Sequence, residues 1–301
     1  MSFYLVTGGA GFIGSNLARK LLCDGHEVLL LDNLSTGSLK NIPKESICIQ
    51  GSLVGEINSI KIKAPDGIFH LGIPSSTPLY RSNRYLVGKA ISEFISLFEY
   101  AKQNNVKVVY ASSSSVYNGC SVPWKEGIEL LPTDFYSEVR ISFERLTKVY
   151  YDLYNVKSIG LRMFSVYGPH EEYKKQYANL ITQLLWAKLK DETFEIYGNG
   201  EQRRDVVYVD DIIKAFIMSM NSNIEYGIFN IGTGINYNIN AIAKKIGTKI
   251  KYIPVPFKNY VDVTLADTSK TKKELGFSTS ISLDEGLEKL KKYYEEEISW
   301  K

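Results

Sequence analysis

The chain has 301 residues, of which 44% are hydrophobic and 23% charged, with a formal net charge of +3. This composition is typical of a globular protein with a large core, and it gives no reason to expect nucleic acid or a membrane surface as a partner. The three cysteines lie far apart, which argues against a disulfide framework, and no metal site is predicted. No apolar run is long enough to span a membrane and the first predicted strand starts at residue 3, so a cytoplasmic location is expected.

The first stretch of the chain contains a glycine-rich turn between a strand and a helix. The hydrophobic pattern predicts a strand, a helix and a second strand over residues 3–6, 12–24 and 27–31. Gly8, Gly11 and Gly14 lie at the strand-to-helix turn, and Asp32 follows the second strand. This context predicts a dinucleotide site, with a pyrophosphate at the helix N-terminus and ribose hydroxyls on Asp32. A carboxylate there repels a 2′-phosphate, which favours NAD over NADP.

The alternation of strands and helices continues as far as residue 163. Further strands are predicted over residues 47–50, 67–71, 106–111 and 158–163, and helices over residues 84–104 and 136–155. Such βα units imply a parallel, doubly wound sheet, whose ligands collect beyond the carboxyl ends of the strands. His70 and the serines 112–115 lie at such strand ends, and we expect His70 to be structural, at the sheet edge near the cofactor.

After residue 169 the predicted elements become shorter and mixed. Helices are expected over residues 178–190, 210–220 and from 283 onward, with a strand near 194–197 and other short elements over 205–209, 228–231, 238–246 and 251–253. The fold class is therefore α/β, a doubly wound parallel Rossmann sheet with a smaller mixed α/β substrate lobe. We predict an NAD-binding domain over residues 1–165, to which residues 203–231 and 260–270 return. The substrate lobe then comprises residues 166–202, 232–259 and 271–301.

Two segments beyond the glycine turn carry chemistry when taken together. Ser112–Tyr117 ends a strand, and Tyr136 precedes Arg140 by four residues. With them the chain resembles the extended short-chain dehydrogenase/reductase family, the NAD-dependent nucleotide-sugar epimerases and dehydratases, over nearly its whole length. The matching segments are residues 7–14, 32–37, 70–71, 112–117, 136–144, 162–169, 198–205, 208–211, 229–234, 275–277 and 285–287. The segment 32–37 is most similar to UDP-galactose (UDP-glucose) 4-epimerases.

The resemblance implies a catalytic group of three residues. Tyr136 would take the proton from the sugar 4-hydroxyl while hydride passes from C4 to NAD, and Ser113 would hydrogen-bond the same oxygen. A tyrosine is ordinarily protonated at neutral pH, so such a base needs a neighbouring cation. The family has lysine at the position of Arg140, which keeps the charge but presents a planar fork. Either a tolerated exchange or an inactive relative fits this departure.

The resemblance also implies binding residues. Cofactor contacts beyond the three glycines and Asp32 are expected from Phe12, Ile13, Asn33, Ser35, Gly37, Ser52, Leu53, Leu71, Gly72, Tyr136 and Arg140. Substrate contacts are expected from Ser113, Ser165, Tyr177, Tyr197 and Arg204. Arg204 is predicted to clamp the nucleotide diphosphate, or alternatively to form a salt bridge with Asp205 or a neighbour. Ser165 stands where the family usually has asparagine, and Ser52 where an aspartate commonly contacts adenine.

Several reactions compete on this framework. Dehydratases of the family carry an Asp–Glu pair where this chain has Ser114 and Ser115, and sugar-acid decarboxylases usually carry glutamate at the latter position. Keto-sugar reductases usually prefer NADP, which Asp32 opposes. A 4-epimerase of UDP-galactose and UDP-glucose is therefore favoured. Three alternatives stay open: another nucleotide-sugar epimerase, a keto-sugar reductase, or a weakly active or inactive relative that binds NAD and a nucleotide sugar.

A homodimer is a further expectation. The predicted helices 84–104 and 136–155 resemble the pair that forms a dimer bundle in the family. Ile141, Leu146 and Val149 fit either that bundle or packing within one chain.

Overall fold

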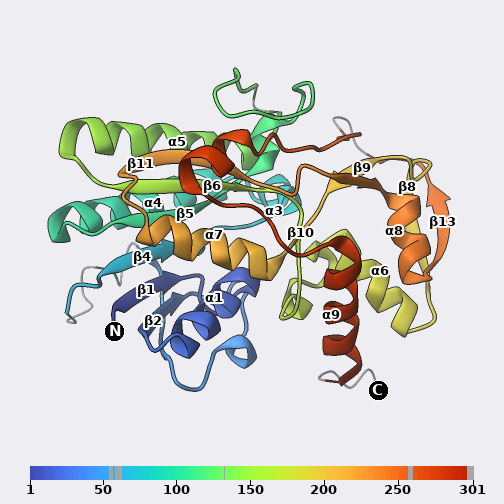
Figure 1. Ribbon diagram of the computed structural model, residues 1–301, viewed down its shortest axis with the longest axis horizontal. Coiled ribbons are helices and arrows are strands. Elements are labelled where there is room, and N and C mark those ends of the chain that lie inside the picture. Colours follow the sequence, from blue (N-terminus) through green and yellow to red (C-terminus); the bar gives the residue numbers. More distant parts are fainter. Residues whose placement is uncertain (54–56, 58–62, 132, 257–259, 297–301) are drawn as a thin grey trace.

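A computed structural model describes residues 1–53, 57, 63–131, 133–256 and 260–296. Within them the centre is one seven-stranded sheet in the order β11, β6, β5, β4, β1, β2, β3 (Figure 1). Its strands are β1 (Phe3–Thr7), β2 (Glu27–Asp32), β3 (Ile47–Gln50), β4 (Gly67–His70), β5 (Val108–Ser113), β6 (Ser158–Met163) and β11 (Tyr226–Ile231). Every neighbouring pair is parallel, so all the carboxyl ends meet at one edge.

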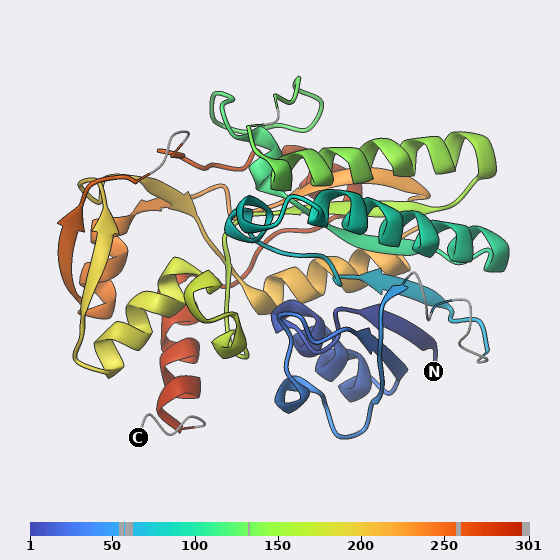
Figure 2. The ribbon, with the colours of Figure 1, turned by 180° about the vertical axis from the view of Figure 1, so that it is seen from behind.

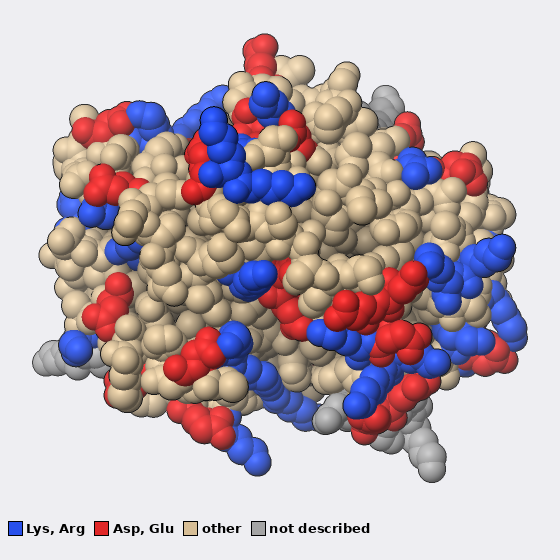
Figure 3. Space-filling view, viewed as in Figure 1, with Lys and Arg blue, Asp and Glu red and all other residues tan. Residues whose placement is uncertain are grey.

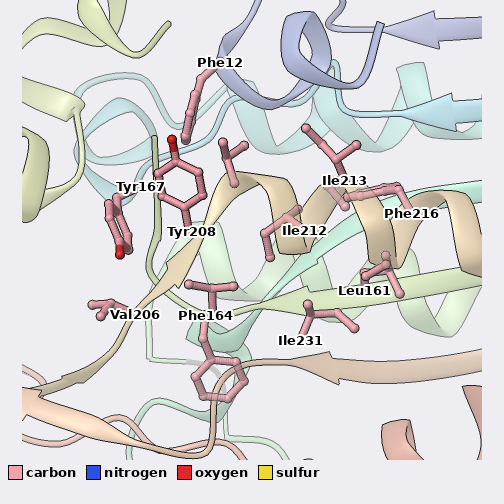
Figure 4. Packing of buried hydrophobic residues seen from close by; sticks show 14 of the residues in the cluster. Phe12, Leu161, Phe164, Tyr167, Val206, Tyr208, Ile212, Ile213, Phe216 and Ile231 are labelled. Carbon is pink, nitrogen blue, oxygen red and sulfur yellow. The ribbon is translucent and has the colours of Figure 1, made fainter. Parts of the chain in front are cut away.

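Helices cover both faces of this sheet, which explains why its strands are apolar almost throughout. Helices α1 (Phe12–Cys23) and α7 (Val209–Asn221) cover one face, and α4 (Leu86–Asn104) and α5 (Phe135–Tyr154) cover the other. Because side chains alternate along a strand, Val6 of β1 packs beneath α1 and α7 while Leu5 packs beneath α4 and α5. Figure 4 shows the first of these layers, with Ile212 on α7 and Leu161 on β6.

Aromatic rings join α4 to α5. The Phe94 and Phe143 rings are stacked, with centroids 4.0 Å apart and planes 4° apart, and neither side chain is exposed. Ile141 and Leu146 also pack into the sheet or its covering helices, whereas Val149 is 48% exposed. Of the three residues considered for a dimer bundle, two therefore belong to the packing within one chain.

The second lobe is small and mixed, and Figures 1 and 2 show it at the side of the sheet. Its strands form two-stranded pairs: β8 (Thr193–Tyr197) with β13 (Lys249–Ile253), β9 (Arg203–Asp205) with β12 (Asn236–Asn238), and β7 (Val166–Tyr167) with β10 (Val207–Tyr208). Its helices are α6 (Leu180–Leu189), α8 (Ile239–Ile246), α9 (Leu283–Glu296) and the short η3 (Glu172–Tyr177). The short η4 (Thr271–Leu275) packs against the main sheet, where the Thr271 hydroxyl donates to the Asn230 carbonyl of β11. The predicted fold class is confirmed.

The predicted domain boundaries stay a proposal, although two observations bear on them. β11 pairs with β6 in the main sheet, and α7 packs beneath that sheet. Residues 257–259 and 297–301 of the predicted lobe lie outside the described residues.

Some predicted elements differ from the structure. The element expected over residues 205–209 is two strands, because β9 pairs with β12 while β10 pairs with β7. β5 begins at Val108, two residues later than predicted, because the Val106 N–H donates to the Ala101 carbonyl at the end of α4. Helix α3 (Thr77–Ser82) and the short helices η1 (Leu39–Asn41) and η2 (Ser114–Tyr117) were not predicted.

His70 is the last residue of β4 and lies at the carboxyl edge of the sheet, as expected. Its strand, β4, lies between β1 and β5 near the middle of the sheet. The side chain is 1% exposed and its Nδ1 lies 2.7 Å from the Thr7 Oγ1. Burial, with a smaller contribution from Arg140, lowers the pKa of His70 to about 3. A neutral, buried imidazole with a hydrogen-bond partner fits the structural role that was expected.

The surface carries charges of both signs. Figure 3 shows lysine and arginine side chains interspersed with aspartate and glutamate on one face of the molecule. None of the helices within the described ranges has both the length and the apolar character needed to cross a membrane.

We predict that Phe143→Ala destabilises the fold strongly. Removing a fully buried ring is expected to lower the free energy of unfolding by about 3–5 kcal/mol, since the stack with Phe94 leaves a cavity when one ring is lost. Urea denaturation measures this change. Leu39→Ala is the control, because that side chain is 64% exposed and its loss is expected to change stability by about 0.5 kcal/mol or less. Equal effects of the two substitutions would contradict the packing described.

Candidate active site

A cleft of about 620 Å³ opens at the carboxyl edge of the sheet. Its wall contains 18 of the 20 predicted site residues: Gly8, Gly11, Phe12, Ile13, Gly14, Asp32, Asn33, Ser35, Ser52, Leu53, Leu71, Gly72, Ser113, Tyr136, Arg140, Ser165, Tyr177 and Arg204. The other two lie off the wall. Gly37 packs against the backbone of Ala10, and Tyr197 is 37% exposed with its ring beside Tyr260, which does line the cleft.

The glycine turn brings three backbone segments into contact. Gly8 has a φ of +69°, and a Cβ there would lie 2.6 Å from the Leu71 carbonyl carbon. A Cβ on Gly14 would lie 2.1 Å from the Gly8 oxygen. The first intrahelical bond of α1 runs from the Ser15 N–H to the Gly11 carbonyl, so the N–H groups of residues 12–14 precede it. These groups and the positive end of the helix dipole suit a pyrophosphate.

Asp32 is held by the same turn. Its Oδ2 accepts from the Ala10 N–H at 2.9 Å and its Oδ1 from the Leu34 N–H at 2.7 Å. The carboxylate is 8% exposed, and burial raises its pKa. Each oxygen keeps a lone pair that can accept a hydroxyl from the cleft. The turn and this carboxylate together fit a dinucleotide with a free ribose diol.

Tyr136 and Arg140 occupy successive turns of α5, beside the end of β5. The Arg140 guanidinium carbon lies 4.9 Å from the centroid of the Tyr136 ring. Its Nη1 donates to the Ala111 carbonyl at 2.9 Å and its Nη2 to the Pro74 carbonyl at 3.4 Å. The side chain is 3% exposed, and its Nε has no partner among the described residues. The Arg140 cation therefore lies next to the tyrosine ring, but both of its terminal nitrogens donate to backbone carbonyls.

Ser113 lies at the end of β5, where η2 begins. Its Oγ accepts the Ser115 N–H at 3.2 Å, which leaves the hydroxyl hydrogen available to the cleft. The Ser137 Oγ donates to the Ser115 carbonyl at 3.0 Å and so joins this turn to the start of α5. The predicted catalytic serine and tyrosine are thus held on adjoining parts of one wall.

A buried ion pair supports this wall from behind. Arg162 donates from Nη2 and Nε to the two carboxylate oxygens of Glu144, at 2.6 and 2.8 Å. The Ser112 Oγ donates to the same carboxylate at 2.6 Å, and the Arg162 Nη1 donates to the Tyr117 hydroxyl. Because both charges are about 7% exposed, they depend on each other for solvation. The network fixes both ends of the segment that contains Ser113.

Arg204 lies at the far end of the cleft. Its Nη1 donates to the carbonyls of Arg203 and Asp262, and its guanidinium carbon lies 5.6 Å from the Tyr260 ring centroid. Burial lowers its pKa. Asp205 instead accepts hydrogen bonds from Thr233, Gly234 and Ala266, so the alternative pair between Arg204 and Asp205 does not form within the described residues. Arg204 is left facing the cleft as a cation suited to an anionic ligand.

The sequence reasoning missed several residues of the wall. Lys174 lines the cleft 5.3 Å from the Phe12 ring centroid, where the buried Glu171 carboxylate holds it. Asn179, Asp134 and Glu93 also line it. Lys174 belongs to a charged segment that the sequence suggests is a loop but that forms η3, and Glu93 belongs to an otherwise ordinary amphipathic helix, so no local pattern marked either. Asp134, two residues before Tyr136, had a signal as a helix N-cap, and its Oδ1 accepts the Ser137 N–H.

The chain is similar to several known proteins in sequence and in fold. The model of the NAD dependent epimerase/dehydratase family matches residues 4–232. The UDP-glucuronate 4-epimerase of Thermodesulfobacterium geofontis is 32% identical over 320 residues, covering 99% of this chain and 98% of the relative. The UDP-glucose 4-epimerase of Thermotoga maritima, solved with UDP-glucose, is 30% identical with a TM-score of 0.90, over 97% of this chain and 98% of that one. A UDP-N-acetylglucosamine 4-epimerase from Methanobrevibacter ruminantium is 30% identical with a TM-score of 0.92, over 99% of each chain.

We predict that Gly14→Ala impairs NAD binding. Its Cβ would overlap the Gly8 carbonyl, and overpacking of about 1–3 kcal/mol would displace the turn and weaken binding by about tenfold or more. Calorimetric titration with NAD measures the affinity. Gly88→Ala on α4 is the matched control, since a Cβ there meets nothing within 4 Å, and we expect it to leave NAD affinity unchanged. Unchanged affinity in Gly14→Ala would contradict the role given to this turn.

Proposed function

Because the chain belongs to the NAD dependent epimerase/dehydratase family, we propose that it is a nucleotide-sugar 4-epimerase that interconverts UDP-galactose and UDP-glucose. NAD is the cofactor of this family and fits the glycine turn and Asp32. The observation that carries the proposal is the cleft wall on which Ser113, Tyr136 and Arg140 meet, with serine at both positions after Ser113.

The proposed chemistry needs few groups from the protein. NAD, when bound, supplies the acceptor and later the donor of a hydride. Tyr136 takes the proton of the sugar 4-hydroxyl and returns it after the sugar has presented its other face. Ser113 donates its free hydroxyl hydrogen to the same oxygen, and Arg140 provides positive charge beside the tyrosine ring. The buried pair of Arg162 and Glu144 keeps the serine segment in place.

Elimination of water is disfavoured on this wall. Such a reaction needs an acid and a base beyond the tyrosine, and Ser114 and Ser115 supply neither. The cleft-lining carboxylate nearest to Tyr136 in the sequence is Asp134. Its Oδ1 accepts the Ser137 N–H, and its Oδ2 lies 3.4 Å from the Thr77 hydroxyl that donates to it. A carboxylate that caps α5 in this way is poorly placed to move protons.

The nucleotide and the position on the sugar are supported by likeness. The three relatives described above are all 4-epimerases of UDP-linked sugars, but their sugars differ. Arg204 is proposed to bind the diphosphate, with Ser165 beside the substrate phosphate, Tyr177 as a further substrate contact and Tyr197 near the base. UDP-N-acetylglucosamine and UDP-glucuronate are therefore the substrates to test after UDP-galactose.

One observation favours a second candidate, a weakly active binding protein. The Arg140 fork donates to the Ala111 and Pro74 carbonyls, and these contacts compete with any that it would make to a ribose. This reading keeps the binding of NAD and a nucleotide sugar but loses efficient turnover.

We predict that the purified chain converts UDP-galactose to UDP-glucose in the presence of NAD, as followed by chromatography. Tyr136→Phe is expected to lower kcat by about 10²–10⁴-fold, because it removes the base. Arg140→Lys keeps the charge and is expected to stay active, whereas Arg140→Met is expected to lose activity. NAD binding without product from wild type or Arg140→Lys would contradict this substrate, and activity in Arg140→Lys alone would identify Arg140 as an inhibitory exchange.

We also propose that the chain forms a homodimer through α4 and α5. Val149 and Leu153, one turn apart on α5, are 48% and 66% exposed and form an apolar stripe. Light scattering at micromolar concentration is expected to give the mass of two chains for wild type and of one chain for Leu153→Glu. A single monomeric species of the wild type would contradict the dimer.

A further inference from the structure

A second carboxylate lies on the cleft wall near Asp32. Glu93 projects from the middle of α4 and is 6% exposed, yet it lines the cleft. The Ser52 hydroxyl, just beyond β3, donates to its Oε1 at 2.6 Å. Lys89 is the nearest cation, with its Nζ 3.9 Å from the same oxygen, and it is itself 55% exposed. No other hydrogen bond to the Glu93 carboxylate forms within the described residues.

Glu93 and Ser52 lie where the strand order predicts the adenine end of a dinucleotide. Asp32 ends β2, and the Gly51 N–H beyond β3 donates to the Asp32 carbonyl. Ser52 therefore follows directly on the residue that is bonded to Asp32. A pyrophosphate at the helix after β1 and a ribose at the end of β2 would direct the attached base toward β3, the outermost strand of the sheet.

The Glu93 and Ser52 side chains in this part of the wall can only accept hydrogen bonds from a ligand. A glutamate carboxylate only accepts hydrogen bonds, so the Ser52 hydroxyl must be the donor in their contact. With its hydrogen used, the serine oxygen also offers only lone pairs to the cleft. Leu53 and Ile73, which are 4% and 8% exposed, line the cleft nearby and provide apolar surface for a flat ring. The site therefore presents two acceptors beside apolar walls.

We propose that Glu93 and Ser52 together recognise the adenine of NAD by accepting its 6-amino group. That amine carries two N–H donors, which match two neighbouring acceptors. Hypoxanthine has an oxygen at position 6 and a single N–H at position 1, so one of the two acceptors would face another acceptor. Glu93 is then a specificity residue, because α4 supplies the carboxylate that Ser52 lacks. The inference rests on NAD binding and is independent of the sugar.

The test compares NAD with nicotinamide hypoxanthine dinucleotide by calorimetric titration of the purified chain. A charged hydrogen bond contributes about 1.5–3 kcal/mol, so we expect wild type to bind NAD about tenfold or more tightly than the hypoxanthine analogue. Glu93→Gln offers an amide N–H to the oxygen at position 6, and we expect it to weaken NAD and to abolish or reverse the preference. Ser52→Ala, which leaves the carboxylate in place, is expected to reduce the preference.

Glu99→Gln is the matched control. It makes the same change of charge on the same helix, at a carboxylate that bonds Lys102 and Tyr150 away from the cleft, and it should keep the wild-type preference. Equal affinity of wild type for the two dinucleotides would overturn the inference while leaving NAD dependence intact, even if Glu93→Gln failed to fold. An unchanged preference in a folded Glu93→Gln would overturn it as well. Absence of NAD binding to wild type would overturn both the cofactor and this inference, whereas lack of sugar turnover would bear only on the proposed reaction.

Discussion

The close approach of the Gly8 turn, the start of α1 and the end of β4 is the constraint on which the rest of the site depends. No Cβ fits on Gly8 or Gly14 without overlapping backbone, so the main chains of the three segments can approach this closely only with glycine at these two positions. The Ala10 N–H from this turn then orients the Asp32 carboxylate. The turn thereby sets both the helix terminus that suits a pyrophosphate and the acceptor that suits a ribose.

The opposite wall is organised by polar contacts rather than by close backbone packing. Glu144 and Arg162 are buried beneath Ser112, and removing one member of such a pair typically costs about 3–5 kcal/mol because the other charge is left without a partner. Together with the link from Ser137 to Ser115, this pair holds the end of β5 against the start of α5. The wall is therefore rigid where Ser113 and Tyr136 would have to act together on one oxygen atom.

Negative and positive side chains of the cleft come from different parts of the fold. Carboxylates of Asp32 and Glu93 lie toward β2 and β3, where a dinucleotide offers hydroxyl and amine donors. The cations Lys174 and Arg204 come from the second lobe and line the same cleft. Arg140 also lines the cleft, with its guanidinium carbon 4.9 Å from the centroid of the Tyr136 ring. One cleft thus contains both carboxylates and cations, which suits the proposed binding of a dinucleotide and a nucleotide sugar.

The sequence by itself determined what depends on short-range patterns. Apolar runs, helical periodicity and the glycine spacing before Asp32 were sufficient for the parallel sheet and the dinucleotide turn, because each feature lies within one βα unit. Only the tertiary structure decided which side chains meet across units. Ser52 and Glu93 are 41 residues apart, and the carbonyl that receives the Arg140 Nη2 belongs to Pro74, 66 residues away. The split of β9 from β10 and the partners of Arg204 likewise follow from strands and loops distant in the chain, which no local pattern encodes.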